Sequence, residues 1–357
     1  MKQLTIALFL VFLTNSLTAQ VFISNGEYII ISAQNEKVFD AAGGNKDNGT
    51  NICVWDFNGQ ENQKFIFEFA DNGEFVINSK HSGKRIDVSQ GSTQDLANLQ
   101  LWEMNTSPAQ KFRLEPVENT DMFMIVNVNS NKAITLDPNS GNVFQLSKPS
   151  PNDKQGGNLN QCWRIAQRLT FQNDGSKKKL DVQGGLKTAG AKLQIYDNNN
   201  SKAQAYDLIP VANSSDFYLR NINSLKYLTV TNNNNASGAV IEQNDFNITA
   251  LQKFQTDKVS EYAYYIKPTG SSFVLGVQNN NNVNGTYVIL ADRQSTASQH
   301  WTFYNYDPKG TSQHVKEELK DAGKAVGSKV VETGGKAVEK TKEIGNTAKD
   351  KLKKLFK

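Results

Sequence analysis

Short runs of alternating or β-branched hydrophobic residues recur along most of the chain and predict β-strands. Examples are Glu27–Ile31 and Glu74–Ile77, where hydrophobic side chains dominate a segment of strand length. Such runs are typical of half-buried β-structure. Turns rich in Asn, Gly and Ser separate them, as at residues 232–235, and no sustained helical period occurs before Pro308. Short strands with frequent turn signals predict an all-β barrel or sandwich.

A Gln-x-aromatic pair occurs six times at nearly even spacing. Successive Gln residues lie 47, 51, 43, 48 and 47 residues apart. This regular period indicates an array of one supersecondary unit, and six units divide into two groups of three. We number the units one to six, and their pairs are Gln63/Phe65, Gln110/Phe112, Gln161/Trp163, Gln204/Tyr206, Gln252/Phe254 and Gln299/Trp301.

A second pattern precedes the pair in units one, two and four. An aromatic residue follows an Asp after 15 positions, and the Gln follows that aromatic residue after 8. An Asn also stands three positions after the aromatic residue in each of these units. Unrelated loops would not repeat two spacings three times, so these residues share a place in the unit. The sets are Asp40, Trp55 and Asn58; Asp87, Trp102 and Asn105; and Asp181, Tyr196 and Asn199.

These motifs resemble the ricin-B-type lectin family over about residues 22–306. The turn at Asp181–Gly184 and the segments Leu99–Trp102 and Leu193–Tyr196, each followed by Gln-x-aromatic, carry the resemblance. It implies two tandem β-trefoil domains in which the Gln-x-aromatic ring lies in the core around a pseudo-threefold axis. It also implies that each competent unit binds a sugar through the Asp, the later aromatic residue and the following Asn.

In unit two the resemblance implies a sugar site of Asp87, Trp102 and Asn105, with Gln100 as a fourth member. A carboxylate accepts from two hydroxyls at once, and such charge-assisted hydrogen bonds are strong. A flat aromatic ring offers area to the C–H face of a sugar, and an Asn amide both donates and accepts. The structural alternative is that Asp87 caps a turn and that Trp102 is ordinary packing.

The other units have related sets or depart from the pattern. Unit three keeps Asp137 but has Leu146 where the aromatic residue is expected. Unit five has Thr229, and unit six has Gly276, in the region of the Asp. We expect these three units to complete the threefold without binding, whereas two or more live sites would make the protein multivalent. Unit four offers Asp181, Gln194, Tyr196 and Asn199, and unit one offers Asp40, Trp55 and Asn58 with Cys53 in place of the Gln.

The first residues are typical of a secretory signal. Lys2 precedes an apolar run at Leu4–Leu13, and the small residue Ala19 ends the segment. This pattern predicts a signal at residues 1–19 and a secreted or cell-surface product. The run is short for a membrane-spanning helix, and a retained N-terminal anchor is the alternative.

The remaining chain is long enough for two domains with real hydrophobic cores, which we place at residues 22–168 and 169–307. Cys53 and Cys162 are the only cysteines, so a disulfide framework does not stabilise these domains. The two fall in different units, which disfavours a bridge and predicts buried free thiols. Two Cys and three scattered His give no zinc-type spacing, so we expect neither a metal nor a cofactor.

The net charge of +4 is unevenly distributed. Residues 311–357 contribute +5 and Lys2 contributes +1, which leaves −2 for the body. A mildly acidic body argues against nucleic acid as a partner, because phosphate binding needs a basic face. The sequence has no Gly-x-Ser-x-Gly motif and no phosphate loop. Its repeated Asp residues occur one per unit, whereas a glycosidase needs a carboxylate pair, so we expect a binding protein and not an enzyme.

Residues 311–357 differ in composition and are rich in Lys, Glu, Ala, Val and Gly. Apolar or small residues recur there every 11 positions, as at Val315, Val326, Ala337 and Ala348. This period is close to helical and resembles late-embryogenesis-abundant-like repeats, although several glycines lower helicity. Three interpretations stay open: a loosely helical or disordered solvated tail, an amphipathic helix on an anionic membrane surface, and a helix that self-associates or docks on a partner.

The leading hypothesis is a secreted carbohydrate-binding protein whose partners are glycans or glycoconjugates. The resemblance alone implies a galactose-like or other pyranoside sugar. The alternative is a structural or protein-interaction β-trefoil at the cell surface or in extracellular matrix. Exposure of Trp55, Trp102 and Tyr196 beside their Asp partners separates the two, because burial away from the carboxylates would favour the alternative.

Overall fold

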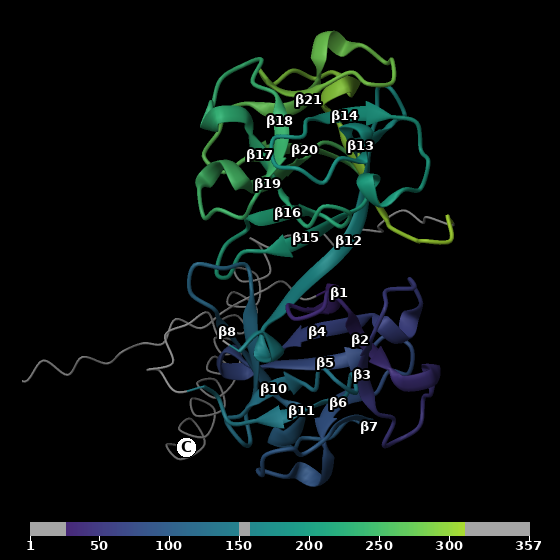
Figure 1. The fold of residues 1–357 in the computed structure, drawn as a ribbon, viewed down its shortest axis with the longest axis vertical. Coiled ribbons are helices and arrows are strands. Elements are labelled where there is room, and N and C mark those ends of the chain that lie inside the picture. Colours follow the sequence, from purple (N-terminus) through teal and green to yellow (C-terminus); the bar gives the residue numbers. More distant parts are fainter. Residues whose placement is uncertain (1–25, 150–157, 311–357) are drawn as a thin grey trace, which may run out of the picture.

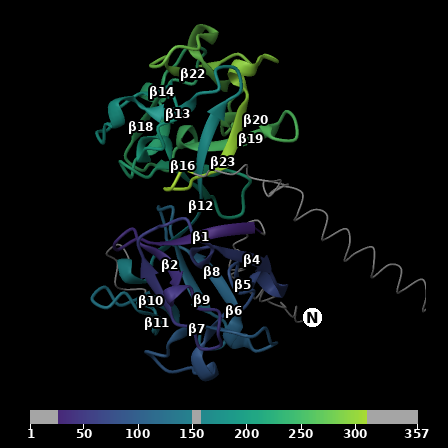
Figure 2. The ribbon, with the colours of Figure 1, turned by 90° about the vertical axis from the view of Figure 1, so that its right-hand side faces the viewer.

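The computed structural model describes residues 26–149 and 158–310, which form an all-β structure (Figures 1 and 2). The predicted signal at residues 1–19 and the predicted tail at residues 311–357 lie outside the described residues. The described chain consists of 23 strands and short 3₁₀ turns. No helix in this part of the chain has the length and hydrophobicity needed to cross a membrane. The prediction of an all-β fold is confirmed.

Six antiparallel strands close a first barrel in the lower half of Figure 1. β1 pairs with β4 and β12, and the pairs β4–β5, β5–β8, β8–β9 and β9–β12 complete the ring. A closed ring leaves no free strand edge. The bounds are Gly26–Ser32 (β1), Phe65–Phe69 (β4), Phe75–Ser79 (β5), Phe112–Pro116 (β8), Phe123–Asn127 (β9) and Trp163–Asn173 (β12).

A second barrel of the same kind follows. β12 pairs with β15 and β23, and β15–β16, β16–β19, β19–β20 and β20–β23 close the ring. The bounds are Tyr206–Pro210 (β15), Phe217–Asn221 (β16), Lys253–Lys258 (β19), Ala263–Pro268 (β20) and Trp301–Asn305 (β23).

β12 belongs to both barrels. Its first residues pair with β1, as Ala166 with Ile29, and its later residues pair with β15, as Arg168 with Asp207. The boundary that the sequence places after residue 168 therefore falls inside a continuous strand. The two barrels are joined without a flexible linker at this point, which is visible as the long arrow in Figure 1.

Three hairpins cap the far end of each barrel. Those of the first barrel lie toward the lower end in Figures 1 and 2, and those of the second lie in the upper half. The first set is β2 (Val38–Ala41) with β3 (Ile52–Trp55), β6 (Arg85–Val88) with β7 (Leu99–Trp102), and β10 (Ala133–Leu136) with β11 (Val143–Leu146). The second set is β13 (Lys179–Val182) with β14 (Leu193–Tyr196), β17 (Tyr227–Val230) with β18 (Ile241–Asn244), and β21 (Val274–Val277) with β22 (Val288–Ala291).

Two kinds of 3₁₀ turn recur in the units. One kind follows the first strand of a hairpin, and the other ends at the Gln of the Gln-x-aromatic pair; η3 (Asp71–Gly73) belongs to neither kind. The first kind is η1 (Ala42–Gly44), η4 (Ser89–Gly91), η7 (Gln183–Gly185), η9 (Thr231–Asn233) and η11 (Gln278–Asn280). The second kind is η2 (Glu61–Gln63), η5 (Pro108–Gln110), η6 (Leu159–Gln161), η8 (Lys202–Gln204), η10 (Ala250–Gln252) and η12 (Ala297–Gln299).

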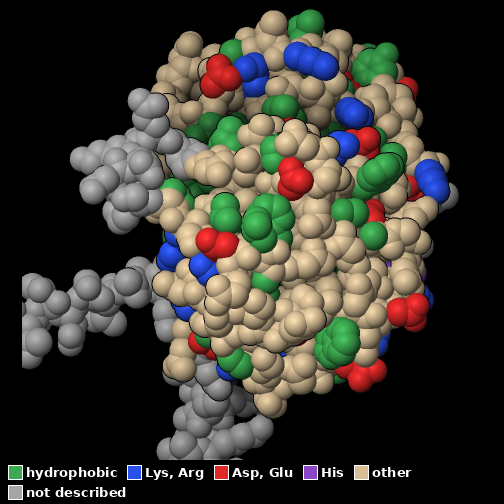
Figure 3. Space-filling model, turned by 60° about the horizontal axis from the view of Figure 1, so that its bottom comes forward, with side chains coloured by type: hydrophobic (Ala, Val, Ile, Leu, Met, Phe, Trp, Pro, Cys, Tyr) green, Lys and Arg blue, Asp and Glu red, His purple; other side chains and the backbone are tan. Residues whose placement is uncertain are grey.

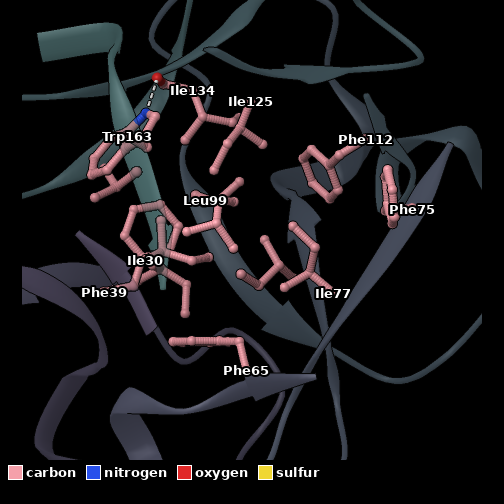
Figure 4. Close-up of a cluster of buried hydrophobic side chains, with 14 of the residues drawn as sticks. Ile30, Phe39, Phe65, Phe75, Ile77, Leu99, Phe112, Ile125, Ile134 and Trp163 are labelled. Atoms are coloured by element: carbon pink, nitrogen blue, oxygen red, sulfur yellow. Dashed lines mark hydrogen bonds between the residues drawn. The ribbon is translucent and has the colours of Figure 1, made fainter. Parts of the chain in front are cut away.

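Each barrel has its own hydrophobic core, one drawn from residues 28–165 and the other from residues 169–303. The ring of every Gln-x-aromatic pair is fully buried in these cores, as the family resemblance implied. Figure 4 shows Phe65, Phe112 and Trp163 spaced around the first core. The Trp163 indole N–H donates to the Ile134 carbonyl at 2.9 Å, and Trp301 makes the equivalent bond in the second core.

A ring of three asparagines marks the pseudo-threefold axis of the first barrel. Asn98 donates to Asn51 at 2.9 Å, Asn51 donates to Asn142 at 2.9 Å, and Asn142 donates to Asn98 at 3.1 Å. One Asn comes from each hairpin, so the cyclic pattern follows the repeat directly. In the second barrel the corresponding bridge positions hold Lys192, Val240 and Tyr287, and the ring of amides is not reproduced.

The interface between the barrels combines a hydrophobic cluster with buried charges. Glu36 accepts from both terminal nitrogens of Arg220, at 2.7 and 2.8 Å, and from Arg164 at 3.3 Å. Arg164 also pairs with Asp121 at 2.8 Å, and the Tyr227 hydroxyl donates to the same carboxylate. These bonds fix one barrel against the other. The apolar members of the interface are Ile29, Ile31, Val38, Ala166, Ile209, Tyr218 and Tyr227.

Both cysteines are free. Cys162 is buried and Cys53 is partly buried, and burial raises the pKa of both thiols. The expectation of unbridged thiols is confirmed, although Cys53 is less enclosed than predicted.

Candidate functional site

In unit two the strand register brings the predicted residues onto one hairpin. Asp87 on β6 lies opposite Gln100 on β7, whose amide donates to the carboxylate at 3.1 Å. Trp102 stands two residues farther along β7 and so points to the same face as Gln100. Diagonal neighbours of this kind lie about 7–8 Å apart, within reach of a long side chain. Asp87 is 6% exposed and Trp102 is 40% exposed, which sets a recessed carboxylate beside an accessible ring.

Unit four repeats this geometry. Asp181 on β13 lies opposite Gln194 on β14, and the Gln194 amide donates to the carboxylate at 2.8 Å. Tyr196 stands two residues farther along β14 with an exposed ring, while the carboxylate is buried. The agreement of two units from different barrels indicates that the arrangement is a property of the repeat.

Unit one holds its carboxylate in a different way. Asp40 lies opposite Cys53, whose thiol contacts the Asp40 carbonyl at 3.7 Å and not the carboxylate. Asn62 and Gln63 each donate to the carboxylate at 2.9 Å. Trp55 is the most exposed of the three site aromatics, and the Lys37 ammonium lies 5.5 Å from its ring centre. The unit-one carboxylate is therefore oriented by η2.

Burial raises the pKa of Asp40, Asp87 and Asp181, and hydrogen bonds from neighbouring Gln or Asn amides oppose that rise in part. Each carboxylate has about four acceptor positions, and two neighbouring amides use only two of them. The unused positions can accept hydroxyl groups, while the exposed ring beside them offers an apolar face. This combination suits a polyhydroxylated ligand.

The predicted asparagines form hydrogen bonds within their own loops. In Asn58, Asn105 and Asn199 the side-chain oxygen accepts the backbone N–H of the residue two positions later, at 2.8–3.0 Å. Their backbone N–H groups donate to the Gln of the Gln-x-aromatic pair, at 2.8–3.1 Å. The structure thus does not bring these side chains onto the carboxylates, and they shape the loop that follows the aromatic residue.

The Gln of the Gln-x-aromatic pair is a loop clamp. In unit two, Gln110 accepts from the Asn105 backbone N–H at 3.0 Å and donates to the Glu103 carbonyl at 2.9 Å. The same two bonds, to residues five and seven positions earlier, recur in units one, four, five and six. In unit one the Gln63 amide also donates to the Asp40 carboxylate at 2.9 Å. The clamp therefore ties the loop to the carboxylate.

Sequence reasoning missed Asn62, Gln63 and their counterparts as members of the sites. Asp-to-Gln spacing is 23 in units one, two and four, a signal that could have joined the two motifs. Asn62 offered no such signal, because units two and four have Ala109 and Ala203 at that place.

The structure corrects the sequence interpretation of unit three. Thr135, and not Asp137, corresponds to Asp87, since Thr135 pairs across its hairpin with Phe144 as Asp87 does with Gln100. The Gln161 amide donates to the Thr135 hydroxyl at 3.0 Å. Asp137 lies in the following turn, where its carboxylate accepts from the Asn139 backbone and the Ser140 hydroxyl, and those hydrogen bonds lower its pKa.

Units five and six lack the Asp at the expected place. Thr229 lies opposite Glu242, and Gly276 lies opposite Ile289. A Cβ at Gly276 would meet the Gln299 side chain at 3.0 Å, so the clamp fills the space that an Asp would need. Unit five keeps a carboxylate, but on the opposite strand of the hairpin.

The surface around the first barrel's hairpins is largely uncharged. Figure 3 brings the lower end of the molecule forward and shows scattered acidic, basic and hydrophobic side chains among other polar groups and backbone. Within the described residues no group of three or more His, Cys, Asp or Glu could hold a metal ion.

A protein-family model described as ricin-type beta-trefoil lectin domain-like matches the chain four times. The matched segments are residues 18–102, 62–147, 108–196 and 159–244. Together they cover more than half of the chain, and they begin 44, 46 and 51 residues apart, close to the repeat period. No curated protein matches the chain.

Three solved structures illustrate the range of proteins to which the chain is similar. The designed threefold-symmetric protein ThreeFoil is 26% identical, with a TM-score of 0.36 and coverage of 40% of this chain and 98% of its own. A ricin B-like lectin of Macrolepiota procera, solved with lactose, is 18% identical, with a TM-score of 0.34 and coverage of 38% and 94%. An exo-β-1,3-galactanase from Clostridium thermocellum is 14% identical, with a TM-score of 0.38 and coverage of 79% and 68%. These scores are too low for any of the three to carry an argument about function.

Proposed function

Because the chain belongs to the ricin-type β-trefoil lectin-like family, we propose that it is a secreted, multivalent carbohydrate-binding protein. Its binding sites are the hairpins of units one, two and four, and it binds glycans without catalysis. Family membership supports the carbohydrate-binding role. The signal pattern at residues 1–19 supports secretion.

One observation supports the site assignment more than any other. Trp55, Trp102 and Tyr196 are 59%, 40% and 39% exposed, whereas most aromatic side chains of the described residues are buried; Tyr262 is the other strongly exposed ring. Each of the first three rings stands two residues beyond the position opposite a buried Asp. A protein that used these hairpins only for packing would have no reason to present a ring beside a carboxylate three times.

Each residue of a site would have its own role in sugar binding. The Asp accepts from adjacent sugar hydroxyls, and the aromatic ring covers the C–H face of the same sugar. Gln100 and Gln194 hold the carboxylate in place in units two and four, and Asn62 and Gln63 do so in unit one. The expected ligand is a galactose-like or other pyranoside residue, a choice that rests on the family resemblance alone.

The same exposure of the aromatic side chains argues against the alternative of a β-trefoil that serves only structure or protein interaction. That alternative expected the three rings to be buried away from their Asp partners. A catalytic role has no support from the site, because each hairpin supplies one carboxylate and hydrolysis of a glycoside needs two.

A glycan-array screen of the full chain beside the Asp87→Asn/Asp181→Asn double variant tests the proposal. We expect the wild type to bind a defined class of glycans and the double variant to lose at least about tenfold in retention on that class, roughly the effect of one strong hydrogen bond. Asn keeps the size of Asp, so thermal unfolding should show that both proteins are folded. Absence of binding by the wild type would contradict the proposal.

A further inference from the structure

Unit five has a hollow that the aromatic-and-Asp sites do not explain. It has a volume of about 560 Å³ and is lined by Lys192, Thr231, residues 232–234, Ala239 and Val240. Sites for small molecules have volumes of about 300–1,000 Å³, so this one could hold one or two sugar rings. It lies between the hairpins of units four and five, beside two of the positions that the asparagine ring occupies in the first barrel.

The polar groups of the hollow form a connected set. The Lys192 ammonium donates to the Thr231 hydroxyl at 3.2 Å and to the Glu242 carboxylate. The Thr231 hydroxyl lies 3.1 Å from the same carboxylate oxygen and 2.8 Å from the Val240 carbonyl. An ammonium has three donors, and these two bonds leave one for a ligand.

Unit five has a carboxylate, that of Glu242, on the opposite strand of the hairpin from the place that Asp occupies in units one, two and four. Glu242 bridges to Lys192 as Gln100 bridges to Asn51 in the first barrel, so it holds the place of the Gln that supports the Asp in unit two. The Asp position itself holds Thr229, whose hydroxyl donates to the Leu251 carbonyl. The carboxylate of unit five therefore lies on the other strand of the hairpin, and its hydrogen-bond partners Lys192 and Thr231 line the hollow.

The charged groups of the hollow indicate which class of ligand it would bind. Lys192 is neutralised by Glu242, so the hollow offers no free positive charge to a phosphate or a carboxylate. Asn232 and Asn233 add amide donors and acceptors at the exposed rim, and Ala239 and Val240 add apolar surface. Neutral donors and acceptors beside a small apolar surface match the hydroxyls and C–H groups of a neutral saccharide.

We propose that this hollow is an additional saccharide-binding site, built on unit five without the aromatic residue and Asp of units one, two and four. The inference rests on the proposed carbohydrate-binding function and extends it to a unit that the sequence pattern assigns to structure only. It gives the second barrel two sites of different chemistry, Asp181 with Tyr196 and the hollow beside Lys192.

The test uses the full chain with the three other sites disabled by Asp40→Asn, Asp87→Asn and Asp181→Asn. This triple variant is screened on the same printed array of glycans as the wild type. It is compared with a protein that also has Asn232→Gly and Asn233→Gly. We expect the triple variant to retain a subset of neutral glycans and the added changes to reduce that retention at least about tenfold, as the loss of two hydrogen bonds predicts.

The Gly substitutions are chosen because they do not strain the backbone. Asn232 and Asn233 have φ angles of 55° and 50°, in the left-handed region that Gly adopts freely. Units one and four have Gly-Gly at the corresponding turn positions. Asn279→Gly is the matched control, since Asn279 has a φ of 54° in the equivalent turn of unit six and does not line the hollow. Thr231→Val removes a hydroxyl from inside the hollow and provides a second disabling change.

Each outcome of this test either supports or overturns the proposed site in unit five. Residual binding that falls with the Asn232→Gly/Asn233→Gly pair and with Thr231→Val, but not with Asn279→Gly, supports the hollow. Residual binding that none of these changes affects would overturn it, as would a triple variant that binds no glycan while the wild type does. A wild type that binds no glycan would overturn both this inference and the proposed function, so the two failures are distinguishable.

Discussion

At the scale of single residues, the sites depend on pairing an exposed ring with a buried acid. Such a pair is costly for folding alone, because burial disfavours the charged carboxylate and a large exposed ring contributes little to a core. Hydrogen bonds from neighbouring amides partly offset the cost of burying the acid, while Trp55, Trp102 and Tyr196 remain exposed. Residues held in this way are expected to affect binding more than stability.

Trp102→Ala should therefore weaken glycan retention in unit two while leaving the free energy of unfolding within about 0.5 kcal/mol of the wild type. Loss of ring stacking should lower affinity about three- to tenfold, since aromatic contacts contribute about 0.5–1.5 kcal/mol beyond buried area. The measurement is titration with the best array glycan in a background where Asp40 and Asp181 are changed to Asn. Met104→Ala is the control, because Met104 is also exposed and is not one of the proposed sugar-binding residues; equal losses for the two variants would refute the stacking role.

Glycan retention should also depend on acid pH. The pKa of Asp87 and Asp181 lies above the ordinary value of 3.8 because burial penalises the carboxylate. A raised pKa means that these groups take up a proton at a higher pH than an exposed Asp does. Binding should thus be full above this raised pKa and be lost as the pH falls through it. Retention on a glycan column across an acidic pH series measures the midpoint, and a midpoint at or below 3.8 would contradict the buried-carboxylate account.

At the scale of the element, the repeated unit is a hairpin with a loop that the Gln-x-aromatic pair fastens to the barrel. The aromatic ring enters the core, and the adjacent Gln satisfies one N–H and one carbonyl of the loop. Buried backbone groups without partners are expensive, so the Gln is required wherever the loop is present. This explains the Gln of units one, two, four, five and six, whereas in unit three Gln161 donates to the Thr135 hydroxyl and the Ser147 carbonyl. The ring varies among Phe, Tyr and Trp.

Gln110→Ala should lower the free energy of unfolding by about 2–4 kcal/mol, because it leaves the Asn105 N–H and the Glu103 carbonyl without their partner. It should also reduce binding by unit two, since the loop and the carboxylate lose a common support. Chemical denaturation measures the first effect. Gln94→Ala is the matched control, as Gln94 is exposed in the same unit, and a loss below about 1 kcal/mol for Gln110→Ala would show that the clamp is not structural.

The sequence predicted the repeated hairpin and its Asp and aromatic residues, but it did not predict every residue that contacts the carboxylates. Periodic spacing located Asp40, Asp87, Asp181 and their aromatic partners because all of them repeat at fixed intervals. Asn62 could not be found in that way, since units two and four have Ala109 and Ala203 at its place, and Asp137 was misassigned because it lies two positions after the corresponding residue, Thr135. The hydrogen bond from Asn62 to Asp40 depends on the folded geometry and leaves no repeated spacing, unlike the Gln63–Asp40 bond, whose spacing of 23 recurs in units two and four.

At the scale of the whole molecule, a rigid interface fixes how the sites are presented. The shared strand β12 and the Glu36–Arg220 and Arg164–Asp121 ion pairs join the barrels. The hairpins that hold Asp87 and Asp181 lie on opposite sides of that interface (Figures 1 and 2). A multivalent binder built in this way is suited to joining two glycan-bearing partners, with avidity limited by the fixed separation of its sites.

Glu36→Gln should destabilise the protein by about 2–3 kcal/mol, because the buried Arg220 would lose the closer of its two charged partners and keep only Asp207 at 3.7 Å, while Gln keeps the size of the side chain. Thermal unfolding at several ionic strengths measures the effect. Glu61→Gln serves as the control, since the Glu61 side chain is 59% exposed and its Lys80 partner lies 3.9 Å away. If both variants unfold at the same temperature as the wild type, the ion pairs do not hold the barrels together.

The most direct test of the account is a crystal structure of the full chain soaked with the best glycan from the array. We predict a sugar ring stacked on Trp102 or Tyr196, with hydroxyls within hydrogen-bond distance of the Asp87 or Asp181 carboxylate. A glycan found only at positions away from the Asp40, Asp87 and Asp181 hairpins would contradict the central claim that the repeated Asp and aromatic residues form the sugar sites.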